Sequence, residues 1–336
     1  MKPIHRGLLI ATSLLFASAP ALAKERPPTN PRVFGTRAVV ACDAVEQSCG
    51  MAVISFPSGV STLVPYGRAD IAVASMALPS VDVAQAIIAR IDSGATPQEA
   101  IDWVQTVDPY ATTRQLAAVK LHPDGSVTLG QTTGADASDH TCAVRGGTFV
   151  VQANNMTTPD ICQAMANGFL QAHGSLPQRL YASLKAGALV GGDRAGERSG
   201  VVRVWNTTVD TAFYTHVLAD AVVHAHSDAL RELGVQLNRY QGTLGVPYPS
   251  DQVTLDADTA RLVKRVLRKL GYYHGRMDGS WSDAAEQALY DFNWNNLFFL
   301  KPTEVVNGTR KIDGVLVNFL RDADLGALVR ASASEG

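Results

Sequence analysis

The sequence predicts an α+β protein, in which helices pack an antiparallel sheet, followed by a small domain of three helices. Three observations lead to this fold class. Runs rich in β-branched residues lie on both flanks of residues 36–205, and helical segments lie in pairs between them. Beyond residue 254 the apolar residues recur at helical spacing. A doubly wound parallel sheet would instead show strands and helices in regular alternation.

Six short runs are expected to form the strands. Each is rich in β-branched residues and is bounded by Gly, Asp, Asn or Ser, which favour turns. His122-Pro123-Asp124-Gly125 is a turn that joins two of these runs. The predicted strands are Thr36–Cys42, Gly50–Ser55, Gln115–Leu121, Val127–Gln131, Thr148–Gln152 and Val201–Trp205.

Capping residues mark where the helices begin and end. Ser80 can cap a helix that stops at Gly94, and Thr96-Pro97-Gln98-Glu99 combines a capping box with proline at the first helical position. Thr158-Pro159 opens another helix. The predicted helices are Val81–Ser93, the segment after Thr96, Thr158 to about His173, Pro177–Ala186 with Gly187 as its end, and Val217 to about Asn238.

A domain boundary is expected at residues 242–254, which form a linker. Gly242 to Asp251 carries two glycines and two prolines, a composition typical of a boundary. Residues 36–241 then form the larger domain and residues 255–326 the smaller one. The helices predicted for the smaller domain are Asp256–Leu270, Ser282–Asn293 and Lys311–Asp322.

The amino terminus has the three parts of a secretory signal. Lys2 and Arg6 give a positive start, Gly7–Ala17 is apolar, and Ala21-Leu22-Ala23 is a cleavage site, so residues 1–23 are the signal peptide. Residues 24–35 are read as a linker or propeptide, because they are proline-rich and lack periodicity. No later run is long enough to cross a bilayer. We therefore expect a periplasmic or secreted protein without stable membrane insertion.

Charge and composition exclude several classes of partner. The chain has 336 residues, is 46% hydrophobic and carries a formal net charge of −2 without a run of Lys and Arg. These values argue against electrostatic binding of nucleic acid. His224 and His226 lie two positions apart on a predicted helix and so do not share a face, which argues against a metal site. We expect no cofactor, and homo-oligomerisation stays open.

The four cysteines are Cys42, Cys49, Cys142 and Cys162. In an oxidising compartment they can form two disulfides, and three pairings are open. Cys42 and Cys49 flank the predicted hairpin turn, which favours that pair together with Cys142–Cys162. The rival interpretation, reduced cysteines or a thiolate metal site, is weaker because the chain has no C-x-x-C spacing.

A series of motifs lies in order between Thr36 and Leu233. It includes Thr36 with Asp43, Gly50-Met51-Ala52-Val53, Arg114-Gln115, Thr133-Gly134, Val151 to Met156, Pro177-Gln178-Arg179-Leu180 and Gly191 to Ser199. The series resembles the uncharacterised bacterial domain-of-unknown-function family 1028, which is grouped with the N-terminal-nucleophile (Ntn) hydrolases. The resemblance implies a four-layer αββα sandwich and puts Thr36 at the strand-opening threonine of that family.

The tail carries a second resemblance. Val266 to Tyr273, Gly275, Asp278-Gly279, Ala284-Ala285 and Ala288 to Phe292 are similar to the three-helix peptidoglycan-binding domain. In that domain the Gly-Tyr and Asp-Gly elements form the turn between the first two helices. The resemblance implies that peptidoglycan or its fragments are the partner.

Thr36 is the candidate nucleophile. A threonine at the free start of a strand can use its own α-amine as general base. Signal removal would leave residues 24–35 in front of Thr36, so self-cleavage after Gly35, through an N-to-O acyl shift, is needed to free that amine. The alternative is an ordinary hairpin whose edge residue is threonine.

Other polar residues are candidates for supporting roles. Asp193, Asn154 and Ser199 would orient the amine or stabilise an oxyanion, and glycines around Asp193 let backbone amides approach a ligand. The alternatives are an Asp193–Arg194 pair and a simple turn. Candidate substrate-binding residues are Arg68, Arg114, Asn155 and Arg194 for polar or carboxylate groups, and Tyr272 and Tyr273 for sugar rings. The arginines can equally be solvated, and the tyrosines can cap a small core.

Two functions follow from these expectations. The first is an exported amide-bond hydrolase that acts at or near peptidoglycan, with Thr36 as nucleophile. The second is a catalytically inactive protein that binds peptidoglycan. They differ in one observation, because only the enzyme is split before Thr36.

Overall fold

The computed structural model describes residues 35–138, 140–208, 215–298, 301–322, 328, 330 and 331. The predicted signal peptide and nearly all of the linker or propeptide therefore lie outside the described residues. Within the described ranges, no helix combines the length and the apolar character that a membrane span requires.

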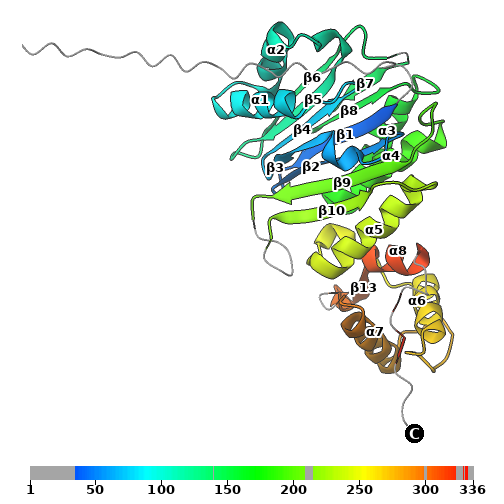
Figure 1. Ribbon diagram of the computed structural model, residues 1–336. Coiled ribbons are helices and arrows are strands. Elements are labelled where there is room, and N and C mark those ends of the chain that lie inside the picture. The colour runs from blue at the N-terminus through cyan, green and yellow to red at the C-terminus, as the bar shows by residue number, and fades with distance from the viewer. Residues whose placement is uncertain are drawn as a thin grey trace, which may run out of the picture.

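The larger domain contains two antiparallel sheets (Figure 1). The large sheet has the strand order β10-β9-β2-β1-β8-β7, and the small sheet has the order β3-β4-β5-β6. The strands of the large sheet are β1 Thr36–Asp43, β2 Ser48–Ser55, β7 Cys142–Arg145, β8 Phe149–Asn154, β9 Ser199–Asn206 and β10 Val217–Val223. The strands of the small sheet are β3 Pro65–Arg68, β4 Ile71–Met76, β5 Gln115–Leu121 and β6 Val127–Thr133.

The two sheets face each other, and helices cover their outer faces. Along β1, Ala38 and Val40 belong to a core shared with Ala72 of the small sheet, whereas Val39 and Ala41 belong to a core shared with helices. This alternation follows from the period of two along a strand. The helices on the large sheet are α3 Ile161–Gln171, α4 Leu176–Leu189 and α5 Ala229–Leu244, and those on the small sheet are α1 Val81–Asp92 and α2 Pro97–Val107.

Local signals explain where several helices begin. The Ser80 side chain accepts a hydrogen bond from Val83 N at 3.3 Å and so caps α1. Thr96 and Glu99 form the predicted capping box at the start of α2. The short 3-10 turns are η1 Val60–Thr62, η2 Ala111–Thr113 and η3 Pro249–Asp251.

The smaller domain combines its helices with a three-stranded sheet of order β11-β13-β12. Its apolar core is separate from those of the larger domain. Its helix α8 packs against α5 of the larger domain (Figure 1). The elements are β11 Gln252–Thr254, α6 Ala257–Lys269, α7 Asp283–Asn295, β12 Glu304–Val306, β13 Thr309–Asp313 and α8 Gly314–Asp322.

Two predicted helices are partly wrong. Val217–Val223 is strand β10, in which Asp220 lies opposite Arg203 of β9 and forms an ion pair with it at 2.8 Å. The segment Lys311–Asp313 belongs to β13 because Asn307 and Gly308 form a tight hairpin turn with positive φ. An Asn-Gly pair favours this turn, and it draws the following residues into a strand.

Gly187, predicted to end a helix, and Gly242, predicted to begin the linker, both lie inside helices. Helix α4 continues through Gly187 to Leu189, and α5 continues through Gly242 to Leu244, so the expected linker starts within a helix. Both glycines lie at close contacts. A Cβ at Gly187 would stand 2.7 Å from Met165 Cγ, and one at Gly242 would stand 1.9 Å from Phe298 Cε1. Here glycine serves close packing rather than helix termination.

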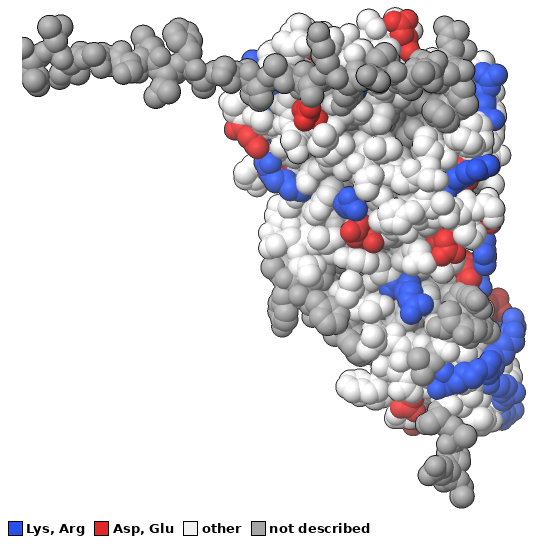
Figure 2. Space-filling view, in the orientation of Figure 1, with Lys and Arg blue, Asp and Glu red and all other residues white. Residues whose placement is uncertain are grey.

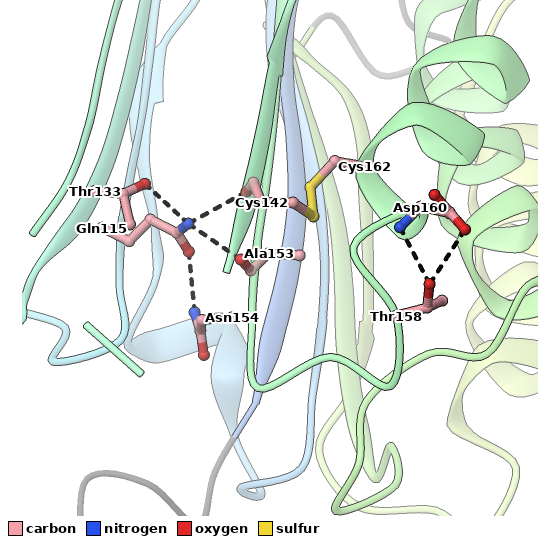
Figure 3. The surroundings of a disulfide bond; sticks show 8 residues. All are labelled: Gln115, Thr133, Cys142, Ala153, Asn154, Thr158, Asp160 and Cys162. Carbon is pink, nitrogen blue, oxygen red and sulfur yellow. Dashed lines mark hydrogen bonds between the residues drawn. A yellow bond between two sulfur atoms is a disulfide. The ribbon is translucent and has the colours of Figure 1, made fainter. Parts of the chain in front are cut away.

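Both disulfides are present, in the pairing that the sequence favours. Cys42 and Cys49 lie directly opposite each other on β1 and β2. Cys142 of β7 is bonded to Cys162 of α3 and so ties the edge of the large sheet to its helical layer (Figure 3).

Candidate functional site

Polar side chains form a row at one end of the large sheet. Thr36 lies opposite Ser55 of β2 and opposite Asn154 of β8, and Ser55 lies opposite Ser199 of β9. Directly opposed residues of antiparallel strands point to the same face. Because Ala38 and Val40 of β1 face the small sheet, these four residues also lie on that inner face. We call this set the polar row.

The hydroxyl of Thr36 is linked to the peptide bond that precedes it. Ser55 Oγ donates to the carbonyl oxygen of Gly35 at 2.8 Å, and the same Oγ lies 2.8 Å from Thr36 Oγ1. A hydroxyl has a single proton, so Thr36 is the donor in its contact with Ser55. Phe56 N also donates to Gly35 O, at 3.3 Å. Thr36 itself is 8% exposed.

The Asp193 carboxyl lies directly against Gly35. A Cβ at Gly35 would stand 2.4 Å from the carboxyl carbon and from both carboxyl oxygens. Ala195 N donates to Asp193 Oδ1 at 2.8 Å, and Asn155 Nδ2 donates to the same oxygen at 3.3 Å. Burial raises the pKa of Asp193 to about 6, against the opposing effect of these donors. The carboxyl therefore exchanges protons close to neutral pH.

A buried arginine holds the loop that carries Asp193. Arg37 lies on β1 next to Thr36 and points to the helical face, where it forms an ion pair with Glu197 and donates to Leu184 O at 3.2 Å. Burial lowers the pKa of Arg37 to about 10. Gly192, with φ of 89°, allows the close approach, because a Cβ there would stand 3.1 Å from Arg37 Nη1.

Asn154 is joined to the small sheet through Gln115. Asn154 Nδ2 donates to Gln115 Oε1 at 3.1 Å, and Gln115 Nε2 donates to Ala153 O at 3.1 Å and to Thr133 Oγ1 at 3.2 Å (Figure 3). Within the described part of the chain, the side-chain oxygen of Asn154 is buried and makes no hydrogen bond. The Asp193 carboxyl also faces the backbone N–H of Gly35, which helps to lower its pKa. One acceptor beside Thr36 thus lacks a donor.

Two of the predicted site residues, Ser199 and Arg114, make their polar contacts away from Thr36. Ser199 Oγ donates to Pro57 O at 2.5 Å and accepts from Val60 N at 3.2 Å, so its hydroxyl holds a loop two strands away from Thr36. Arg114 is buried in an ion pair with Asp108, with Nε 2.7 Å from Oδ2. It stabilises the connection after α2.

Arg68 also lies away from the polar row. It pairs with Asp70 at 2.9 Å and with Asp92 on the outer side of the small sheet. In register it lies opposite Ile71, at the far end of β4 from Met76, which is opposite Gln115. Arg194, in contrast, is exposed next to Asp193, and its backbone N donates to Asn155 O at 3.1 Å.

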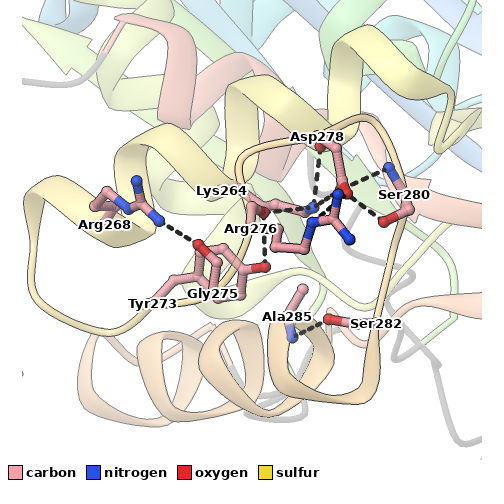
Figure 4. Close-up of polar contacts among 9 residues, drawn as sticks. All are labelled: Lys264, Arg268, Tyr273, Gly275, Arg276, Asp278, Ser280, Ser282 and Ala285. Atoms are coloured by element: carbon pink, nitrogen blue, oxygen red, sulfur yellow. Dashed lines mark hydrogen bonds and ion pairs between the residues drawn. The ribbon is translucent and has the colours of Figure 1, made fainter.

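The predicted tyrosines support the turn between α6 and α7. Tyr273 is buried in the core of the smaller domain and its hydroxyl donates to Arg276 O at 2.9 Å, so its ring is not open to a sugar. Tyr272 packs edge-on against Phe292 at 5.7 Å. Buried Lys264 completes this turn by donating to Arg276 O at 3.1 Å and to Asp278 O and Oδ1 at 3.0 Å (Figure 4).

Exposed aromatic residues of this domain lie elsewhere. Tyr290 and Trp294, on α7, are 60% and 62% exposed. Positions four apart share a face of a helix, so both rings lie on one side of α7. The spacing is readable in the sequence, but the Gly-Tyr-Tyr turn is the more obvious aromatic motif there.

A cavity lies apart from the polar row, and the described residues form no cluster of metal ligands. Among the described residues, no group of three or more His, Cys, Asp or Glu side chains is placed to hold a metal ion. His226 Nδ1 instead accepts a hydrogen bond from Asp228 N at 3.0 Å. A cavity of about 370 Å³ lies between β10 and α5, lined by Asp220, Arg239 and Tyr240 among others, and includes no residue of the polar row.

Comparison with known proteins gives matches to two family models and to a solved structure. The model of a family of unknown function, DUF1028, matches residues 36–233, and the model described as "Putative peptidoglycan binding domain" matches residues 243–320. None of the curated proteins matches. The crystal structure of a DUF1028 protein from Silicibacter pomeroyi has a TM-score of 0.55 and 21% identity over 62% of this chain and 86% of that chain. At this identity the likeness shows the fold alone.

Proposed function

The chain belongs to the DUF1028 family, and from this premise we propose that it is a peptidoglycan-associated protein that cuts its own chain before Thr36 and then hydrolyses an amide bond in peptidoglycan or its fragments. Thr36 Oγ1 is the nucleophile, and the α-amine freed by the cut is its general base. The two facing sheets with helices on both outer faces support a place for the family domain among the Ntn hydrolases.

One observation carries the catalytic part of this proposal. Among the described residues, Asn154 Oδ1 is a buried acceptor without a hydrogen-bond donor, and it lies with the Asp193 carboxyl beside the peptide bond between Gly35 and Thr36. An unsatisfied buried acceptor is costly, and native structures contain few of them. Cleavage before Thr36 produces an amine, which would supply the missing donor to Asn154 Oδ1 and be oriented by that oxygen and the Asp193 carboxyl.

Charge supports the proposed partner. Helix α6 carries Arg261, Arg265, Arg268 and Lys269 on or near the surface. On the face in Figure 2, basic side chains gather over this side of the smaller domain, whereas both signs are interspersed over the larger one. Peptidoglycan stem peptides are rich in carboxylates, which basic side chains attract. Binding through the smaller domain would hold the Thr36 site at the wall.

The disulfides support an extracytoplasmic location. Cys42–Cys49 and Cys142–Cys162 are both formed, and no cysteine of the described chain is free. Such bonds persist in oxidising compartments such as the periplasm and the extracellular space. We therefore propose a periplasmic or secreted protein that is exported by the signal peptide at residues 1–23.

The test is the covalent state of the protein recovered after export. Intact mass and amino-terminal sequencing are expected to give two fragments, one of which begins at Thr36. Thr36→Ala is expected to remain a single chain. The same preparations are then sedimented with purified sacculi, where wild type and Thr36→Ala should bind equally. A wild-type protein that stays whole contradicts self-cleavage.

The burial of Thr36, and the peptide bond that its nitrogen forms in the intact chain, favour a second candidate function. A catalytically inactive peptidoglycan-binding protein would keep that state. A single wild-type chain that sediments with sacculi supports this function over the hydrolase. Absence of sedimentation for every form contradicts peptidoglycan as the partner.

A further inference from the structure

Two hydroxyl groups form a continuous path from the Thr36 side chain to the carbonyl group of Gly35. Thr36 Oγ1 donates to Ser55 Oγ at 2.8 Å, and Ser55 Oγ donates to Gly35 O at 2.8 Å. The strand register fixes Ser55 opposite Thr36, and Ser55 is 1% exposed. The path is therefore held in place by the sheet and shielded from bulk water.

We propose, building on the self-cleavage put forward above, that Ser55 is a catalytic residue of that cleavage and relays the proton of Thr36 Oγ1 to Gly35 O. In this step Thr36 Oγ1 bonds to the carbonyl carbon of Gly35. Its proton moves to Ser55 Oγ as the Ser55 proton moves to Gly35 O. The product is a neutral five-membered ring with one hydroxyl group, and Ser55 is regenerated.

The remaining steps need no reagent other than water. The ring opens by breaking the bond between the carbonyl carbon and the Thr36 nitrogen. The nitrogen gains the proton that the ring hydroxyl loses, so Thr36 holds a free amine and an ester of Gly35. Water then hydrolyses the ester to the Gly35 carboxylic acid and the Thr36 hydroxyl.

The geometry indicates why Ser55 matters to the rate. Negative charge develops on Gly35 O during the attack, and that oxygen already faces Ser55 Oγ at 2.8 Å and Phe56 N at 3.3 Å. Loss of one donor to a developing oxyanion slows a reaction by roughly 10²–10³-fold. We expect Ser55→Ala to slow cleavage by a similar factor. The variant should not abolish cleavage, because Phe56 N still donates to Gly35 O.

The experiment follows cleavage of the full chain from the moment of synthesis. The chain is made by cell-free translation under oxidising conditions, and intact mass is measured over time. Wild type, Ser55→Ala, Ser55→Thr and Ser48→Ala are compared. Ser48 is the matched control, because it is a buried serine at the other end of the same strand. Ser48→Ala should cut at the wild-type rate, and Ser55→Thr, which keeps a hydroxyl, should cut faster than Ser55→Ala.

The outcomes separate this inference from the proposed function. If wild type is never cut, self-cleavage fails, and the relay fails with it. If wild type and Ser55→Ala are cut equally fast, self-cleavage stands and the role of Ser55 is overturned. Should Ser55→Ala not fold, the wild-type rate in mixtures of H₂O and D₂O decides the question. Two protons in flight predict a curved dependence on deuterium content, and a straight line contradicts the relay.

Discussion

Gly35, next to Thr36, is in direct contact with the Asp193 carboxyl. Its missing side chain is what allows the contact, since a Cβ would stand 2.4 Å from the carboxyl group. A contact this short cannot be relieved without moving Asp193 or the start of β1. Glycine at this position therefore has a steric reason that is independent of its φ angle.

Replacing Gly35 by alanine should disturb both stability and cleavage. We expect Gly35→Ala to lower the free energy of unfolding by about 1–3 kcal/mol, as overpacking commonly does, and to slow self-cleavage. Urea unfolding and intact mass provide the two measurements. Gly147→Ala is the control, because a Cβ there meets no atom within 4 Å, and it should change stability by less than about 0.5 kcal/mol. Equal behaviour of the two variants contradicts the contact.

The pH dependence of stability should report on Asp193. The pKa of Asp193 in the folded chain is raised to about 6 from its ordinary value of 3.8. Below the lower of these two pKa values Asp193 is protonated in both the folded and the unfolded chain, so its ionisation does not affect the free energy of unfolding. Between the two values the unfolded chain ionises first, so stability falls as pH rises and then levels off above about pH 6.

The comparison that isolates this effect uses Asp193→Asn, which cannot ionise. The difference in urea midpoint between the variant and wild type should change between pH 4 and pH 6 and be constant outside that window. Glu46 and Asp251, with pKa values raised to about 7 and about 6, titrate in both proteins and cancel. A difference that does not vary with pH rules out the raised pKa.

Some of the candidate residues predicted from the sequence lie together in the fold, and the neighbours that the sequence did not reveal have a physical explanation. Thr36, Asp193, Asn154 and Asn155 are brought close together by β1, β8 and the glycine-rich loop. The sequence does not single out Ser55, because strand register places it opposite Thr36 and the composition of β2 does not reveal register. The partners of the arginines are hidden from the sequence for a similar reason. Arg114 finds Asp108, and the overlooked Arg37 finds Glu197, only through the fold.

At the scale of elements, local signals predicted helices with strong caps and failed where pairing decided the structure. The capping box of Thr96 and Glu99 is local, and α2 begins where it indicates. Val217–Val223 is apolar enough for either state, and its pairing with β9 makes it a strand. Tertiary pairing outweighs the weak helical preference of such a short run.

The outward face of α7 should contribute to wall binding. Tyr290 and Trp294 are both more than half exposed and lie one turn apart, which suits stacking on sugar rings. We expect Tyr290→Ala with Trp294→Ala to reduce sedimentation with sacculi at least about tenfold, a loss near 1.4 kcal/mol. Leu189→Ala, an exposed apolar residue on α4 of the larger domain, is the control and should bind as wild type does. Unchanged sedimentation of the double variant contradicts this role for α7.

At the scale of the whole molecule, a buried polar network joins the two domains. Asp251 accepts a hydrogen bond from Ser175 N, at the start of α4, at 2.8 Å. In the smaller domain Lys301 Nζ lies 3.0 Å from Asp313 Oδ2, and both side chains are buried. Burial is the main cause of the raised pKa of Asp251; the negative charge of Asp313 raises this pKa further, whereas Ser175 and Lys301 lower it. Lys301 thus offsets two carboxyl groups at the junction, where α8 also packs against α5.

This arrangement predicts that the domains unfold together while Lys301 is present. We expect a single calorimetric transition for wild type. Lys301→Met leaves the buried Asp313 carboxylate without its ion-pair partner, which costs about 3–5 kcal/mol, and should weaken the junction enough to separate the transition into two. Lys269→Met, on an exposed residue of α6, is the control and should keep one transition. Two transitions in wild type, or one transition at unchanged temperature in Lys301→Met, would show that the network does not couple the domains. If coupling holds, peptidoglycan bound to the smaller domain fixes the orientation of the Thr36 site as well as its location.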